Sequence, residues 1–159
     1  MYQKSGTADE ANEIDSVVDL LGGREVLRRT PHSALEVHDL IQDGIPGQAL
    51  NHLVELLIVP HHPDFLLEKA FGLSLRTYQR LKNAPERTLA PDQGSRAWQF
   101  AKILARATRV LGSQAAAETW LDTPAIALEQ RKPLDLLATH EGAGLVEALL
   151  TRLEYGVYT

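Results

Sequence analysis

Five side chains between residues 76 and 82 are of the types that contact DNA bases and phosphates. They follow the turn Gly72-Leu73-Ser74, where glycine permits a positive φ and serine can cap the helix that comes next. Leu73, Tyr78 and Leu81 are spaced to face the protein interior. The segment predicts the second helix of a helix-turn-helix motif, with an outer face formed by Arg76, Thr77, Gln79, Arg80 and Lys82.

One residue of the expected first helix departs from this motif. Leu67 and Phe71 supply the apolar face, but Glu68 lies four residues before the turn glycine, where a small alanine usually lets the two helices approach. Two other interpretations therefore stay open. The segment could be a solvated helix whose charges serve solubility, or a helix-turn-helix geometry without strong affinity for DNA.

The distribution of charge along the chain favours DNA binding by its middle part. Residues 64–112 carry 9 basic and 4 acidic side chains, whereas residues 1–63 carry 4 and 10, and residues 113–159 carry 3 and 7. A basic centre between acidic flanks predicts that the centre alone meets a polyanion. The basic side chains of the following helix read mostly as ordinary surface charge: Arg96, Lys102, Arg106 and Arg109.

The last residues of the chain form a second candidate contact. Residues 155–159, Tyr-Gly-Val-Tyr-Thr, are mostly apolar and aromatic, whereas a dispensable tail is usually polar and small. The segment either docks on its own domain or inserts into a partner. The stretch that precedes it is acidic and rich in apolar anchors such as Trp120 and Leu121, which favours a partner-binding module.

Residues that could carry catalysis do not converge in this sequence. The chain has no cysteine, which excludes a thiol nucleophile, a disulfide framework and any metal site that needs thiolates. The adjacent His61 and His62 would diverge on a helix, and no metal-ligand spacing such as H-E-x-x-H occurs. His140-Glu141 beside Gly142 reads as the start of a helix. The sequence predicts no enzyme, no cofactor and no metal site.

Helix start and stop signals position these residues, and strand signals are nearly absent. Helices are expected between Ser33 and Gly44, from Pro46 through Leu57, and over 64–71, 75–82, 95–111, 114–121 and 142–155. Trp98 and Phe100 are expected in the core. The first dozen residues are polar and small and are expected to be a disordered tail. The predicted fold class is all-α, with a helix-turn-helix core and a helical C-terminal module.

The length of 159 residues suits one compact domain or two small ones. The expected division is a tail and short helix over 1–32, a helix-turn-helix region over 33–112 and the partner-binding module over 113–159. The longest apolar run is too short for a membrane helix, and the N-terminus lacks the apolar segment of a signal peptide. A cytoplasmic protein without membrane attachment is therefore expected.

Four blocks of the sequence together resemble the Xre/ParS-type antitoxins that are encoded beside RES-domain toxins. The blocks are Gly72–Lys82, Ala115–Pro124 with a W-L-x-x-P pattern, Arg131–Thr139 with P-L-D-L-L, and Arg152–Tyr158 with Y-G-V-Y. The resemblance extends from about Ser33 to the last residue. Its C-terminal blocks are specific in combination, whereas the helix-turn-helix block alone is a weak signal.

The resemblance implies an antitoxin that binds and silences a RES-domain toxin. Toxins of that family degrade NAD⁺, and family members also bind their own promoter and repress transcription, alone or with the toxin. The toxin-binding residues implied are Trp120, Leu121, Leu134, Asp135, Leu137, Arg152, Glu154, Tyr155, Gly156, Val157, Tyr158 and Thr159. For Arg152 two roles stay open: it could help cover the active site of the toxin, or it could pair with an acidic residue of the toxin.

A cleft that binds NAD⁺ must hold a pyrophosphate, so cationic groups, arginine above all, are expected in it. Glu154 and the terminal carboxylate of Thr159 could mimic the phosphates, with Tyr155 and Tyr158 as anchoring rings. Residues 152–159 are therefore expected to enter or cover the active site of the toxin, braced by the apolar residues of the same module.

A different interpretation is a stand-alone helix-turn-helix regulator whose C-terminal module senses another ligand or partner. Either protein is expected to be a two-fold dimer, because a single helix-turn-helix reads only a few base pairs. The dimer contact is expected on two apolar faces, one formed by Leu35, Leu40 and Ile41, and the other by Leu50, Leu53 and Leu57.

Overall fold

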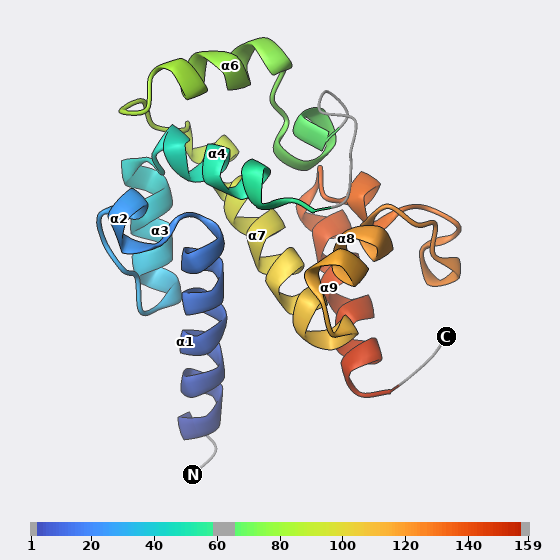
Figure 1. Ribbon diagram of the computed structural model, residues 1–159. Coiled ribbons are helices and arrows are strands. Elements are labelled where there is room, and N and C mark those ends of the chain that lie inside the picture. Colours follow the sequence, from blue (N-terminus) through green and yellow to red (C-terminus); the bar gives the residue numbers. More distant parts are fainter. Residues whose placement is uncertain (1–2, 59–65, 157–159) are drawn as a thin grey trace.

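The computed structural model of this chain describes residues 3–58 and 66–156. Over these ranges every regular element is helical, which confirms the all-α fold class (Figure 1). None of the helices in the described ranges is both long and apolar enough to cross a membrane.

Helix α7, Pro91–Leu111, forms the centre of the molecule (Figure 1). Its buried side chains form a broad face that covers more than half of its circumference, as expected for a helix with several neighbours; they are Ala97, Trp98, Phe100, Ala101, Ile103, Leu104 and Ala107. The helices that pack against it include α1 (Gln3–Leu20), α3 (Ala34–Asp43), α8 (Gln114–Leu121) and α9 (His140–Glu154). The burial of Trp98 and Phe100 confirms their prediction as core residues.

Serine caps fix where three of the helices start. The side chains of Ser33, Ser74 and Ser113 each accept a hydrogen bond from the backbone N–H three residues later, ahead of α3, α6 (Leu75–Asn83) and α8. Glycines with positive φ follow the last residues of α3 and α7. These helices therefore begin and end within a few residues of the predicted positions.

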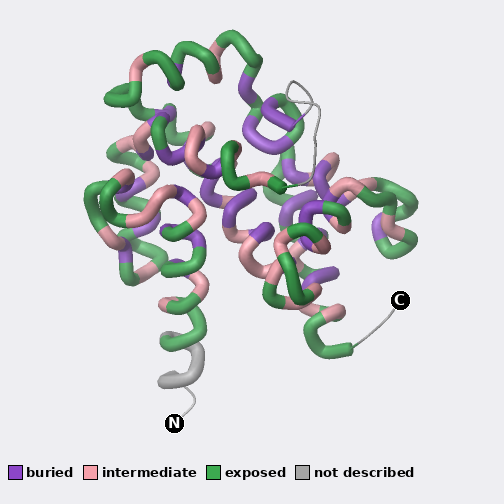
Figure 2. Tube along the Cα trace, viewed as in Figure 1, coloured by how far each residue is buried: buried purple, intermediate pink, exposed green. Residues whose placement is uncertain are grey.

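Shorter elements connect the long helices. Helix α2 spans Gly23–Leu27 and α4 spans Gly47–Leu56. A π-helical turn, η1, covers Leu67–Phe71, and two 3₁₀ turns, η2 and η3, cover Ile126–Leu128 and Pro133–Leu136. Buried residues from 14 to 150 join in a single hydrophobic core (Figure 2). The division into parts 1–32, 33–112 and 113–159 stays a prediction.

The N-terminal region differs from the sequence-based expectation. The first dozen residues were expected to be disordered, but α1 begins at Gln3. Ile14, Val17, Val18 and Leu21 recur at helical spacing and are buried against the rest of the core. Once such a face anchors a helix, each further residue adds a backbone hydrogen bond without a new nucleation cost. The helix therefore extends towards the N-terminus over polar residues.

The apolar faces expected to form a dimer contact lie mostly inside the protein. Leu40, Leu50 and Leu53 are fully buried in the chain's own core, because α3 packs against α7 and α4 packs against α1, α2 and α6. In contrast, Leu35, from the first of the two faces, is 71% exposed. The expected location of the dimer contact is therefore wrong, and the homodimer stays a prediction without an assigned face.

Candidate functional site

The predicted DNA-contacting residues lie on the outer side of α6. Arg76, Gln79, Arg80 and Lys82 are exposed, so their side chains are available to a ligand. Thr77 is partly buried, and its hydroxyl accepts a hydrogen bond from Ser74 Oγ at 3.0 Å. The helix lies at one edge of the molecule, away from the C-terminal end (Figure 1). All five predicted residues thus lie on one helix, and four of them are exposed.

Helix α6 is held by its contacts with α4. Leu81 is buried, and the hydroxyl of Tyr78 donates a hydrogen bond to Asn51 Oδ1 at 2.7 Å. Burial raises the pKa of Tyr78, and the negative charge of Glu55 raises it further. The hydroxyl therefore stays protonated at neutral pH and can donate this hydrogen bond, which fixes the rotation of α6 on α4.

The turn before α6 is built around Gly72, whose φ is +66°. The guanidinium of Arg96 on α7 crosses this turn, and its Nη2 donates to the carbonyl oxygen of Lys69 at 2.8 Å. A Cβ on Gly72 would lie 2.1 Å from Nη1 of the same arginine. The left-handed backbone therefore favours glycine at this position, and the guanidinium of Arg96 occupies the space beside it.

The two helices of the expected helix-turn-helix motif have different packing partners. The turn η1 packs against α7 and η3, whereas α6 packs against α4. Glu68, which replaces the usual alanine, is exposed beside the turn. This arrangement explains why a charged residue is tolerated at that position, since the close approach that alanine normally permits is not what holds α6.

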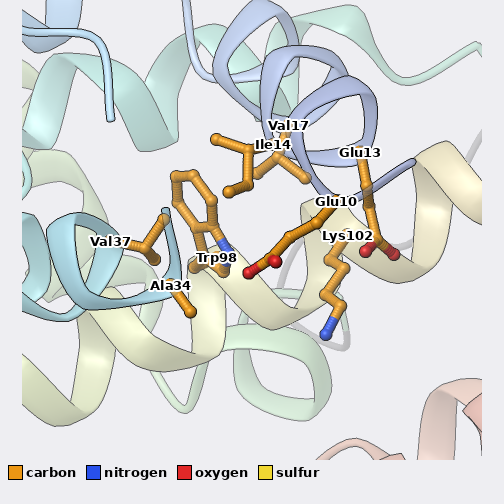
Figure 3. Close-up of a pocket in the computed structure, with 8 residues that line it drawn as sticks. All are labelled: Glu10, Glu13, Ile14, Val17, Ala34, Val37, Trp98 and Lys102. Carbon is orange, nitrogen blue, oxygen red and sulfur yellow. The ribbon is translucent and has the colours of Figure 1, made fainter. Parts of the chain in front are cut away.

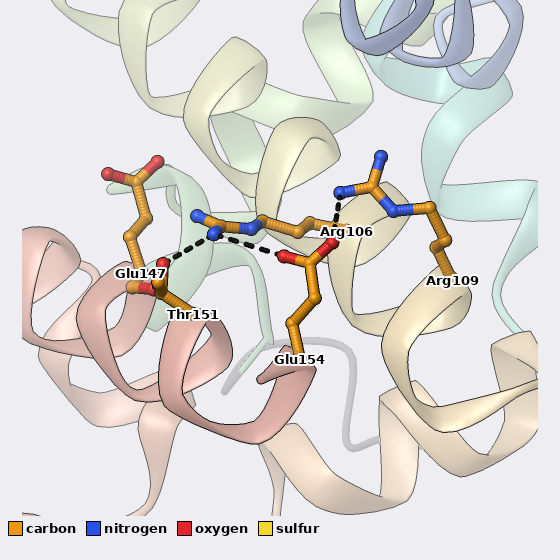
Figure 4. Close-up of polar contacts among 5 residues, drawn as sticks. All are labelled: Arg106, Arg109, Glu147, Thr151 and Glu154. Atoms are coloured by element: carbon orange, nitrogen blue, oxygen red, sulfur yellow. Dashed lines mark hydrogen bonds and ion pairs between the residues drawn. The ribbon is translucent and has the colours of Figure 1, made fainter. Parts of the chain in front are cut away.

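Ion pairs join the C-terminal helix α9 to the central helix α7 (Figure 4). Lys102 Nζ lies 3.3 Å from Glu147 Oε1, and Arg106 and Arg109 each place an Nη2 atom 3.5 Å from a carboxylate oxygen of Glu154. Arg106 also donates a hydrogen bond to Thr151. The basic residues of α7 therefore bind the C-terminal module, and the interpretation as ordinary surface charge is wrong for these three.

Glu154 is therefore occupied within its own chain, which argues against a freely available phosphate mimic. Sequence reasoning missed these pairs because it considered the charges of α7 alone. Positions 102, 106 and 109 match 147, 151 and 154 in helical spacing, and this periodicity was the available signal.

Helix α9 ends at Glu154, and Tyr155 and Gly156 follow it. Tyr155 is 78% exposed, so its ring does not dock on the described part of the protein. Gly156 follows with φ +72°, a left-handed conformation that glycine adopts without strain. Self-docking of the tail, one of the two alternatives, is therefore not what happens at Tyr155. The predicted contacts Val157, Tyr158 and Thr159 lie outside the described residues.

Three predicted toxin contacts are core residues instead. Leu121, Leu134 and Leu137 are buried, because α8 and η3 pack against each other and against the other helices of the core. They can support a partner surface from within but cannot form one. Asp135 is partly buried, and Arg152 is exposed on α9.

Helix α8 buries its charged residue and exposes part of its aromatic one. Glu118 is 1% exposed, and its Oε1 and Oε2 accept from the backbone N–H of Ile58 at 3.0 and 2.9 Å. The side-chain amide of Gln114 donates to Glu118 Oε2 at 2.9 Å and to the carbonyl oxygen of Leu56 at 2.8 Å. Trp120 is partly buried and packs against the core from the other side of the helix. Helix α8 is thus tied to the chain that follows α4.

A small cavity of about 210 Å³ lies between α1, α3 and α7 (Figure 3). Its apolar wall is formed by Ile14, Val17 and Trp98, and Glu10 and Lys102 lie at its edge. Across the described residues, no group of three or more histidine, aspartate or glutamate side chains is arranged to hold a metal ion. This cavity offers room for a small group.

Comparisons with known proteins agree with these features. Residues 106–156 match the family model described as the antitoxin Xre/MbcA/ParS C-terminal toxin-binding domain, which begins inside α7. The chain is 33% identical over 98 residues to an Antitoxin Xre of Yersinia enterocolitica, covering 61% of this chain and 66% of that protein. It is 31% identical over 127 residues to an Antitoxin Xre of Pseudomonas putida, covering 78% and 74%. The chain belongs to the Xre-type antitoxin family.

Proposed function

We propose that this chain neutralises a RES-domain toxin by placing the residues after α9 in the NAD⁺-binding cleft of that toxin. The observation that carries the proposal is the exposed Tyr155 at the end of a rigidly held helix. An exposed aromatic ring costs free energy in water and is a common anchor at protein interfaces. The toxin-binding domain to which α9 belongs, matched over residues 106–156, supports the same role.

The ion pairs between α7 and α9 give the tail a fixed starting point. Arg106 and Arg109 bind Glu154, the last residue of α9, so the direction in which Tyr155 and Gly156 leave is set by the core. A preorganised segment loses less conformational entropy on binding than a free tail. In this proposal Glu154 positions the tail, and the rings of Tyr155 and Tyr158 fill the cleft.

We also propose that α6 binds the promoter of the antitoxin's own gene in a homodimer. The exposed Arg76, Arg80 and Lys82 supply phosphate and base contacts from one helix, and the serine cap fixes its first turn. Helix α6 and the C-terminal end of α9 lie at different ends of the fold (Figure 1). The two activities can therefore be altered separately.

Co-expression with the toxin tests the antitoxin role. A RES-domain toxin encoded beside this gene should stop growth and lower cellular NAD⁺ when produced alone. Production together with this chain should restore both, and the two proteins should co-purify. A chain that neither co-purifies with the toxin nor restores NAD⁺, while it still binds promoter DNA, would instead be the stand-alone regulator.

A further inference from the structure

Helix α8 buries its charged residue and exposes uncharged ones, which is the reverse of an ordinary surface helix. Glu118 is the one ionisable residue in its sequence, QAAAETWL, and it is buried. The outward face carries Ala115, Ala116, Thr119 and part of Trp120, with no charge. Charged residues make up 23% of the whole chain, and exposed helix faces normally carry most of them. The outward face of α8 therefore has the composition of a contact surface.

A shallow groove of about 500 Å³, widely open to solvent, lies along this face. Its lining consists of uncharged residues: Leu111, Ala115, Ala116, Thr119, Trp120 and Thr123. Leu111 and Trp120 pack against the core, which holds the groove wall in place. The two alanines leave room beside the indole that longer side chains would fill. The groove has the size and chemistry to accept one or two apolar side chains.

We infer that this groove binds an apolar side chain of the toxin, as an anchor separate from the tail. The inference rests on the proposed function and adds a second contact to it. The groove lies within residues 106–156, the region matched to the toxin-binding domain, and in the same half of the molecule as the C-terminal end of α9 (Figure 1).

The chemistry of the groove selects this occupant. A nucleic acid requires cations that the lining does not supply, and a charged peptide would lose its hydration without gaining a partner. A leucine, isoleucine, methionine or phenylalanine side chain would bury the exposed part of Trp120, and tryptophan is enriched among residues that dominate interface affinity. Two anchors, a groove and a tail, would also fix the orientation in which the tail meets the toxin.

Matched arginine substitutions test the groove. Ala115→Arg and Thr119→Arg each place a long charged side chain in the groove from an exposed position. Gln42→Arg adds the same charge at an exposed position on α3, which lies outside residues 106–156 and does not line the groove. The affinity of each full-length variant for the purified RES-domain toxin is measured by calorimetry, with thermal unfolding as the check on folding and light scattering on each variant alone.

The groove variants should bind the toxin at least about tenfold more weakly than wild type, because a charge would be buried without a partner, and Gln42→Arg should bind normally. Wild-type affinity in both groove variants overturns the inference while leaving the proposed function intact. If light scattering gives the groove variants alone a lower mass than wild type, and they bind the toxin normally, the inference is overturned. The occupant of the groove is then a second copy of this chain. A wild-type chain that binds no toxin overturns the proposed function and this inference together.

Discussion

Glu118 shows how one residue joins two distant segments. Its carboxylate is buried, yet it accepts hydrogen bonds from the backbone of Ile58 and from Gln114. A buried carboxylate is retained only where such donors replace the water it has lost. Glu118 therefore holds α8, with its outward groove, against the chain that directly follows α4.

The Glu118→Ala variant should lower the free energy of unfolding by about 2–4 kcal/mol. The substitution removes the acceptor for the backbone N–H of Ile58 and the amide of Gln114 and leaves a void at a buried position, and each change is destabilising. Glu118→Gln keeps an acceptor oxygen and the shape of the side chain, so it should cost less than half as much. Urea unfolding of both variants checks this. An alanine variant as stable as wild type would show that the contact contributes nothing to the fold.

Sequence reasoning predicted the exposed residues of α6 but not Glu118. The basic side chains of α6 follow a glycine turn and a serine cap, which are local signals and fix the outward face. A glutamate is exposed in most proteins, so no local feature marks Glu118 as buried. The opposite error concerns Leu121, Leu134 and Leu137, which were expected to contact a partner but are buried. A helical module rich in leucine does not reveal which leucines face outwards.

At the scale of the helices, α6 and α9 are each fixed by a neighbour rather than by their own sequence. The hydrogen bond from Tyr78 to Asn51 and the burial of Leu81 set α6 on α4. The ion pairs of Glu147 and Glu154 set α9 on α7. Helix boundaries followed from serine and glycine in the sequence, whereas these pairings depend on tertiary contacts that the sequence does not show.

The Arg76→Ala/Arg80→Ala variant should lose affinity for promoter DNA by about 1–3 kcal/mol per lost base contact. Its binding should also depend less steeply on salt, because fewer phosphate charges are neutralised. The matched control is Arg24→Ala/Arg131→Ala, which removes the same charge from exposed positions outside α6. Fluorescence anisotropy at several salt concentrations measures both variants. Equal losses in the two would assign DNA binding to net charge rather than to α6.

At the scale of the whole molecule, one hydrophobic core supports both α6 and the C-terminal end of α9. Buried residues from α1 to α9 belong to one hydrophobic cluster, with α7 at its centre. The all-α class could be predicted because helix signals recur along the chain. The contribution of α1 could not, since its polar N-terminal half resembles a tail and its packing against α7, α2 and α4 is a tertiary feature. The expected dimer faces were wrong for the same reason, because most of their residues pack inside the chain's own core.

The most direct test of the account removes residues 155–159 and leaves α9 intact. NAD⁺ consumption by the purified toxin is measured against increasing antitoxin, with toxin binding and promoter binding measured on the same preparation. The truncated chain should still fold, bind DNA and bind the toxin through its C-terminal module, but it should no longer inhibit NAD⁺ consumption. A truncated chain that inhibits the toxin as well as the full chain would contradict the assignment of inhibition to the tail.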